Sequence, residues 1–172
     1  MDRKGYNGQG CYPFMERGYP FFVIDANYKT RICDLCQHPE FIPLLAEWHR
    51  AEWPEVVGCR EELLRTRTSS DAIPKTFVAI KRLQPLGFAS LTANNLPDRP
   101  DLAPWLTSLL VAPEARGQGV GQILIASCMR HVAAAGFAKL YLHTTEAPDY
   151  YRHLGWTEID RIGQKIVFAK QC

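Results

Sequence analysis

The sequence lacks a large excess of charge and any long hydrophobic run, and each absence excludes a class of protein. Twenty Lys and Arg residues stand against 18 Asp and Glu residues, which gives a net charge of +2. No basic stripe of the kind that nucleic-acid-binding domains carry is present. No apolar stretch reaches the ~18 residues of a membrane span, and Pro20 breaks the short apolar run near the N-terminus, so no secretory signal is indicated. We expect a cytoplasmic protein with neither nucleic acid nor a membrane as partner.

The cysteines form no framework. Six are scattered along the chain, and Cys33 and Cys36 make a single Cys-x-x-Cys pair. A zinc site would need a second ligand pair at metal spacing, and none follows. We therefore expect ordinary reduced thiols and no bound metal.

The length fits one globular domain. A chain of 172 residues can bury about two thirds of its unfolded surface. Residues 1–26 are rich in glycine, proline and aromatic residues without helical or strand periodicity, so they are interpreted as an N-terminal extension of unknown role. Residues 27–172 are predicted to form the single domain.

Hydrophobic periodicity predicts a mixed α/β sheet flanked by helices. Phe41, Leu44, Leu45 and Trp48 follow Pro39 at helical spacing and predict a helix over 39–53. The other expected elements are a strand at 28–35, a helix at 59–67, a hairpin of 76–80 and 87–91 joined by Gln84-Pro85, a strand at 105–111, a helix from 121 to 135, a strand at 139–143, a helix near 147–154, and strands at 156–160 and 164–169. The strands at 105–111 and 139–143 should be parallel, because a helix connects them.

The most informative stretch runs from Val111 to Gln122. An apolar strand enters it, Pro113 ends that strand, and Gly117, Gly119 and Gly121 alternate just before the helix. Free backbone N–H groups at a helix N-terminus form an anion site, and phosphate is the usual anion. A P-loop is excluded because no Lys follows the last glycine, and the dinucleotide fingerprint is excluded by Gln122 and by the lack of an acidic residue about 20 positions on.

One pattern does fit: Arg/Gln-x-x-Gly-x-Gly/Ala, satisfied by Arg116, Gly119 and Gly121. Three further features accompany this pattern: the preceding strand, Val111-Ala112-Pro113, and Tyr151-Arg152-His153-Leu154-Gly155-Trp156 downstream. With them, the sequence resembles the GCN5-related N-acetyltransferase (GNAT) superfamily over roughly residues 30 to 170. The resemblance implies the acyl-CoA N-acyltransferase fold, a mostly antiparallel central sheet with two splayed parallel strands and flanking helices.

The resemblance also implies acetyl-CoA as co-substrate. The main chain would hold its pyrophosphate and pantetheine, with Val111 as the candidate oxyanion donor. The residues implied in cofactor binding are Leu109, Leu110, Val111, Arg116, Gly117, Gln118, Gly119, Val120 and Gly121. The Arg116 guanidinium could add charge there or brace the loop.

The implied reaction is direct attack of a neutral primary amine, of a small molecule or a peptide, on the thioester. Tyr151 stands at the tyrosine position of the family and would protonate the leaving thiolate. The 105–111 strand has no Glu that could act as base, so His143 is the preferred candidate. Asp101, Glu146, Asp149 and a water relay are alternatives.

Residues between the first two helices line the acceptor side in the family. Glu52, Trp53 and Glu55 are therefore candidate substrate contacts, and acidic residues there slightly favour a polycationic small molecule. Two other functions stay open: a non-catalytic acyl-CoA-binding or interaction module, which the missing Glu suggests, and an acetyltransferase for protein N-termini or lysines. A homodimer is also left open.

Overall fold

The computed structural model describes residues 30–70 and 72–172; residues 1–26, interpreted above as an extension, lie outside this part. Its strands are β1 (Arg31–Asp34), β2 (Lys75–Lys81), β3 (Gln84–Thr92), β4 (Trp105–Val111), β5 (Lys139–Thr144), β6 (Thr157–Ile162) and β7 (Lys165–Gln171). Its α-helices are α1 (Ile42–Glu52), α2 (Arg60–Arg65), α3 (Val120–Ala134) and α4 (Pro148–His153). The short 3-10 helices are Leu35–Gln37, Pro39–Phe41 and Pro113–Ala115.

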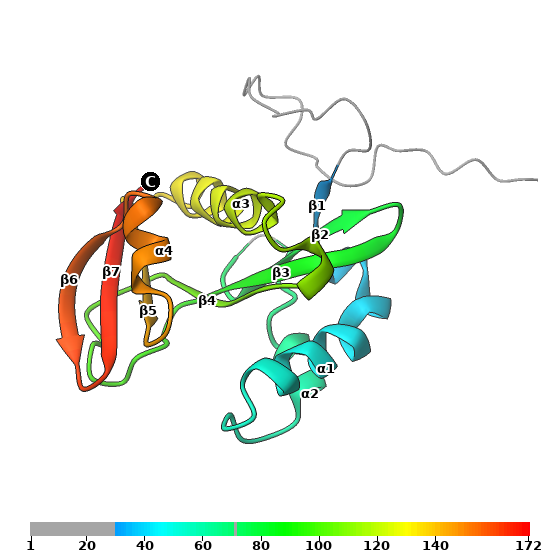
Figure 1. Cartoon of the computed structure of the whole chain (residues 1–172), viewed down its shortest axis with the longest axis horizontal. Helices are drawn as coiled ribbons and strands as arrows, with labels where there is room; N and C mark the ends of the chain where they lie inside the picture. The colour runs from blue at the N-terminus through cyan, green and yellow to red at the C-terminus, as the bar shows by residue number, and fades with distance from the viewer. Residues whose placement is uncertain (1–29, 71) are drawn as a thin grey trace, which may run out of the picture.

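The strands form one sheet in the order β1-β2-β3-β4-β5-β7-β6. Only β4 and β5 are parallel, and every other neighbouring pair is antiparallel. In Figure 1, α3 lies on one side of the sheet and α1 with α2 on the other, while α4 lies against the β5–β7 half. The mixed α/β sheet with two parallel strands expected from the sequence is therefore confirmed.

Three groups of buried side chains hold these layers together. The largest lies between the sheet and α3 with α4, and it joins Phe77 and Leu106 to Leu124 and Phe168. A second lies between α1, α2 and the opposite face of β1–β4. A third, centred on Trp105, lies under the 93–104 connection. Both faces of β4 are thus covered, which is why this strand is almost continuously apolar.

Two sequence expectations about local structure are wrong. The β2–β3 turn is made by Arg82 and Leu83, both with positive φ (50° and 66°), whereas Gln84-Pro85 belongs to β3. The buried face of α1 consists of Ile42, Leu45, Ala46 and His49. Leu44, which was placed on that face, is 38% exposed. The apolar face predicted for this helix is therefore rotated about the helix axis relative to the face that is buried.

No helix in the described part of the chain has the length and apolarity needed to cross a membrane.

Candidate active site

The glycine turn places an open helix N-terminus directly after β4. Gly117 and Gly119 have φ of 73° and 77°, a left-handed conformation that glycine adopts without steric cost. The first backbone bond of α3 runs from the Ile123 N–H to the Gly119 carbonyl, at 3.1 Å. The N–H groups of Val120, Gly121 and Gln122 therefore precede the helical ladder and are available to an anion.

The side chain of Arg116 braces this turn. Its Nε donates to the Val111 carbonyl at 3.1 Å, and its Nη2 lies 3.5 Å from Glu52 Oε2 at the end of α1. Gln118 adds a hydrogen bond from Nε2 to the Glu114 carbonyl at 2.8 Å. The turn is thereby tied both to the end of β4 and to the helix on the opposite side of the sheet.

The parallel strands separate just ahead of this turn. One register pair, Trp105 with Tyr141, joins β4 to β5. The Ala112 N–H donates to Leu86 on β3. Because strand N–H groups alternate in direction, those of Leu109 and Val111 face the β5 side, where no pairing is present, while Leu110 pairs with Phe88. Two of the three β4 residues implied in cofactor binding thus turn their main chain towards the gap.

Tyr150 lies against the start of α3. A Cβ added to Gly121 would stand 2.8 Å from the Tyr150 hydroxyl and 3.7 Å from Val111 Cγ2. This close approach gives Gly121 a packing role besides main-chain binding. It also places the Tyr150 hydroxyl at the glycine turn, a position that the sequence reasoning did not foresee for it.

Tyr151 is more deeply packed than Tyr150. Its ring contacts Trp156 and Phe168, with centroids at 5.9 and 6.1 Å, within the group of side chains that α3 and α4 cover. Burial, with a smaller contribution from Tyr150, raises the pKa of Tyr151 to about 12. Its phenol is consequently protonated throughout the neutral range.

His143 lies on the other face of β5. Its ring makes an edge contact with Trp105 at 6.1 Å, whereas the adjacent Leu142 packs in the same group as Tyr151. Burial and the charge of Lys165 lower the pKa of His143, so its imidazole is neutral at physiological pH. The proposed acid and base therefore stand on opposite faces of the sheet.

A polar cluster at the centre of β4 was missed in the sequence. The strand register shifts here, and Ser108 has φ of 49°. The hydroxyls of Thr107 and Ser108 accept from Arg67 Nη1 at 3.4 and 3.1 Å. Ser108 Oγ also lies 3.2 Å from Nε2 of His49, which is 3% exposed. A bulge thus puts two consecutive side chains on the α1–α2 face of the strand.

The electrostatics of this cluster are positive. Burial, followed by the charges of Arg60 and Arg67, lowers the pKa of His49 to about 4, so the imidazole is neutral. Burial also lowers the pKa of Arg67.

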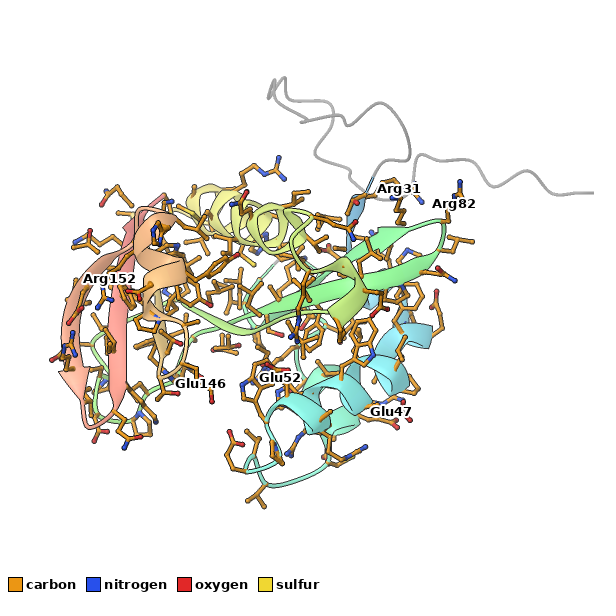
Figure 2. All side chains as sticks on the ribbon, in the orientation of Figure 1. Arg31, Glu47, Glu52, Arg82, Glu146 and Arg152 are labelled. Atoms are coloured by element: carbon orange, nitrogen blue, oxygen red, sulfur yellow. The ribbon has the colours of Figure 1, made fainter. Side chains whose placement is uncertain are left out.

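The predicted acceptor contacts lie around the C-terminal end of α1. Trp53 is half-buried and packs beside His49, and its carbonyl oxygen accepts a hydrogen bond from Arg60 Nη2. Glu52 and Glu55 are exposed. Figure 2 shows Glu52 at the end of α1 nearer β5, with Glu47 farther back along the helix and Glu146 after β5. The Glu52 carboxylate forms an ion pair with Arg116, so its side chain lies next to the glycine turn.

A cavity of about 380 Å³ lies between α3 and α4, starting next to the glycine turn. Its lining residues are Gln122, Ile125, Ala126, Met129, His153, Leu154 and Lys170. In the described residues, no group of three or more His, Cys, Asp and Glu side chains is arranged to hold a metal ion.

Comparison with known proteins gives a family match and many similar folds. Residues 42–156, more than half of the chain, match the family model described as Acetyltransferase (GNAT) family. A search of curated proteins gives no match.

Several solved structures share the fold. An aminoglycoside 6′-N-acetyltransferase complexed with coenzyme A has a TM-score of 0.69 at 18% identity, over 82% of this chain and 96% of that one. The aminoglycoside 6′-N-acetyltransferase from Enterococcus faecium has a TM-score of 0.65 at 17% identity, with the same two coverages. The N-acetylglutamate synthase from Neisseria gonorrhoeae, complexed with coenzyme A and N-acetyl-glutamate, has a TM-score of 0.65 at 15% identity, over 83% of this chain and 35% of that one.

Proposed function

The chain belongs to the GNAT acetyltransferase family, and from this premise we propose that it is an acetyl-CoA-dependent N-acetyltransferase acting on a primary amine. One observation carries the proposal: β4 parts from β5 after a single register pair and leads directly into an open helix N-terminus. The gap offers unpaired strand groups, and the turn offers anion donors. We also propose that residues 27–172 form a single catalytic domain.

Acetyl-CoA would bind through the main chain. The N–H groups that follow Arg116, up to Gly121, would hold the pyrophosphate, since the N–H of Arg116 itself donates to the Pro113 carbonyl at 3.3 Å. The pantetheine would run beside Leu109, Leu110 and Val111 as a short added strand. Arg116 would act chiefly by bracing the turn, because its guanidinium is already bonded to Val111 and close to Glu52. The main-chain groups of Leu109 and Val111 would bind the pantetheine directly, and Leu110 would only shape the strand.

The chemistry would be direct attack of the neutral amine on the thioester carbonyl. Negative charge develops on the carbonyl oxygen, and the Val111 N–H, fixed in the strand and facing the gap, would stabilise it. The C–S bond then breaks, and the thiolate takes a proton from Tyr151. With its pKa raised to about 12, this phenol is always loaded with that proton at neutral pH.

His143 would accept the proton that the amine loses. Its lowered pKa keeps it neutral and able to accept at pH 7, although it also makes it a weak base. Its position on the face opposite Tyr151 suits a reaction in which the amine attacks from one side and the thiol leaves on the other. Trp53 and Glu55 would contact the acceptor, together with Glu52.

Two measurements test the proposal. Isothermal titration calorimetry should show acetyl-CoA binding at micromolar concentration, and free-thiol release should appear with some member of a panel of amines, amino acids, peptides and aminoglycosides. Absence of acetyl-CoA binding would refute the proposed acetyltransferase function. Binding without thiol release from any amine would instead favour the non-catalytic module, and release only with protein or peptide substrates would favour an N-terminal or lysine acetyltransferase.

A further inference from the structure

Arg67 is a partly buried cation for which the described residues provide no counterion. Its Nη1 donates to the hydroxyls of Ser108 and Thr107, at 3.1 and 3.4 Å. No carboxylate in residues 30–70 or 72–172 lies within ion-pairing distance of it. A guanidinium has five N–H donors, and within the described chain two neutral hydroxyls occupy only some of them and neutralise none of the charge. A charge that is partly shielded from water is stabilised by a partner of opposite sign.

The other two described arginines that are not exposed have different partners. Arg60 donates to the carbonyls of Gly58 and Trp53, at 2.9 and 3.1 Å, and so fixes the turn between α1 and α2. Arg99 binds two carboxylates. Among the described residues Arg60, like Arg67, has no carboxylate partner, and its Nε is buried without a hydrogen bond. The bonds of Arg60 fix the α1–α2 turn, whereas those of Arg67 reach the centre of β4.

The groups around Arg67 orient its guanidinium but do not neutralise it. Ser108 Oγ lies between Arg67 Nη1 and His49 Nε2, which is 3.2 Å away. The imidazole is neutral, and its Nδ1 is buried without a hydrogen-bond partner among the residues that the structure describes. The β4 bulge directs the side chains of both Thr107 and Ser108 to the same face, so the two hydroxyls that accept from Arg67 are positioned by the strand.

This cluster stands beside the place where the proposed reaction would occur. Ser108 directly precedes Leu109, whose main chain faces the gap between β4 and β5. Arg67 reaches the strand from the α1–α2 side, which is the side of the predicted acceptor contacts Trp53 and Glu55. A negative group bound to Arg67 would therefore belong to the acceptor and would lie close to its amine.

We infer that Arg67, oriented by the hydroxyls of Thr107 and Ser108, binds a carboxylate of the acceptor. The acceptor is then a small amino acid, with its amine on the carbon next to the carboxylate or one carbon farther. The planar guanidinium fork matches a carboxylate in two parallel hydrogen bonds, and its charge repels a second ammonium group. This inference rests on the proposed N-acetyltransferase function, and it argues against the polycationic acceptor that Glu52 and Glu55 slightly favoured.

The test uses three matched amines: an amino acid, its carboxamide and its decarboxylated amine. Thiol release with the wild-type protein should give a kcat/KM for the amino acid about 10- to 100-fold above those of the other two, the range expected for charge-assisted hydrogen bonds. Arg67→Gln should remove this preference by lowering kcat/KM for the amino acid alone. Arg65→Gln, an exposed α2 position that pairs with Glu61, is the matched control and should retain it.

Acetyl-CoA titration separates the two levels of the proposal. If acetyl-CoA does not bind, the proposed enzymatic function and the proposed acceptor site are both refuted. If it binds and is consumed, but the carboxamide or an aminoglycoside reacts as well as every amino acid tested, the carboxylate site alone is refuted. Should Arg67→Gln fail to fold by circular dichroism, the wild-type comparison of the three amines decides the question by itself.

Discussion

The contact between Gly121 and Tyr150 gives the sharpest test of the packing at the glycine turn. In Gly121→Ala the new methyl group would meet the Tyr150 hydroxyl at 2.8 Å, closer than van der Waals contact allows. Tyr150→Phe removes that oxygen, after which the nearest atoms are Val111 Cγ2 at 3.7 Å and the ring carbon Cζ at 3.9 Å. The two substitutions should therefore compensate one another.

The expected magnitudes follow from two opposing effects. Alanine in place of glycine inside a helix stabilises by about 0.5–1 kcal/mol. Overpacking costs about 1–3 kcal/mol in a well-packed core, but the Tyr150 hydroxyl ends a side chain that is 40% exposed and can shift, so we expect about 1 kcal/mol. Gly121→Ala should thus lower the free energy of unfolding by no more than about 0.5 kcal/mol in the wild-type background. In the Tyr150→Phe background it should raise that free energy by about 0.5–1 kcal/mol, because only the helical gain is left.

The assay is a double-mutant cycle of urea denaturation followed by circular dichroism. A coupling energy of about 1 kcal/mol between the two positions is expected. Tm should differ between backgrounds by several degrees, since about 1 kcal/mol corresponds to ~2–4 °C in a domain of this size. If Gly121→Ala has the same effect in both backgrounds, the Tyr150 hydroxyl does not occupy this position in solution and the reasoning fails.

Three further predictions concern turnover, the turn and pH. Tyr151→Phe should reduce turnover about 100- to 10,000-fold with acetyl-CoA affinity unchanged, as measured by thiol release and calorimetry; a parallel loss of affinity would contradict the acid role. Gly119→Ala forces a Cβ into φ of 77° and should cost about 1–2 kcal/mol in urea denaturation, together with weaker acetyl-CoA binding, whereas Gly119→Asn should cost less. The pKa of His49 is about 4 in the folded protein and about 6.5 when unfolded, so stability should be complete above pH ~6.5 and fall towards pH ~4. His49→Gln should remove up to about 3 kcal/mol of that pH dependence; a pH profile that His49→Gln leaves unchanged would refute the assignment.

The sequence predicted those features that depend on neighbouring residues. β4 matches its predicted range of 105–111, because Pro113 and the glycines end an apolar run unambiguously. The start of α3 and the glycine after it, Gly136 with φ of 86°, are local signals of the same kind. Family membership was predicted for the same reason, since its motifs are short and contiguous.

Features that depend on distant residues were not predicted. His49 falls on the buried face of α1 at positions set by Ile42 and Leu45, but a histidine there gave no apolar signal and the stripe was placed over Leu44 instead. The bond from Arg67 to Ser108 joins residues 41 apart, and only the fold brings them together. The β4 bulge contains no glycine, so no residue there indicated the positive φ of Ser108.

The single register pair between β4 and β5 has a consequence for motion. The β1–β4 and β5–β7 halves are held together on one face by the core under α3, while across the middle of the sheet most rungs of the ladder are missing. In the empty protein the amides of Leu109 and Val111 should exchange readily with solvent deuterium. Bound acetyl-CoA would lie between the halves like an additional strand and would form main-chain hydrogen bonds with β4. Ligand binding should therefore make the two halves unfold as one cooperative unit.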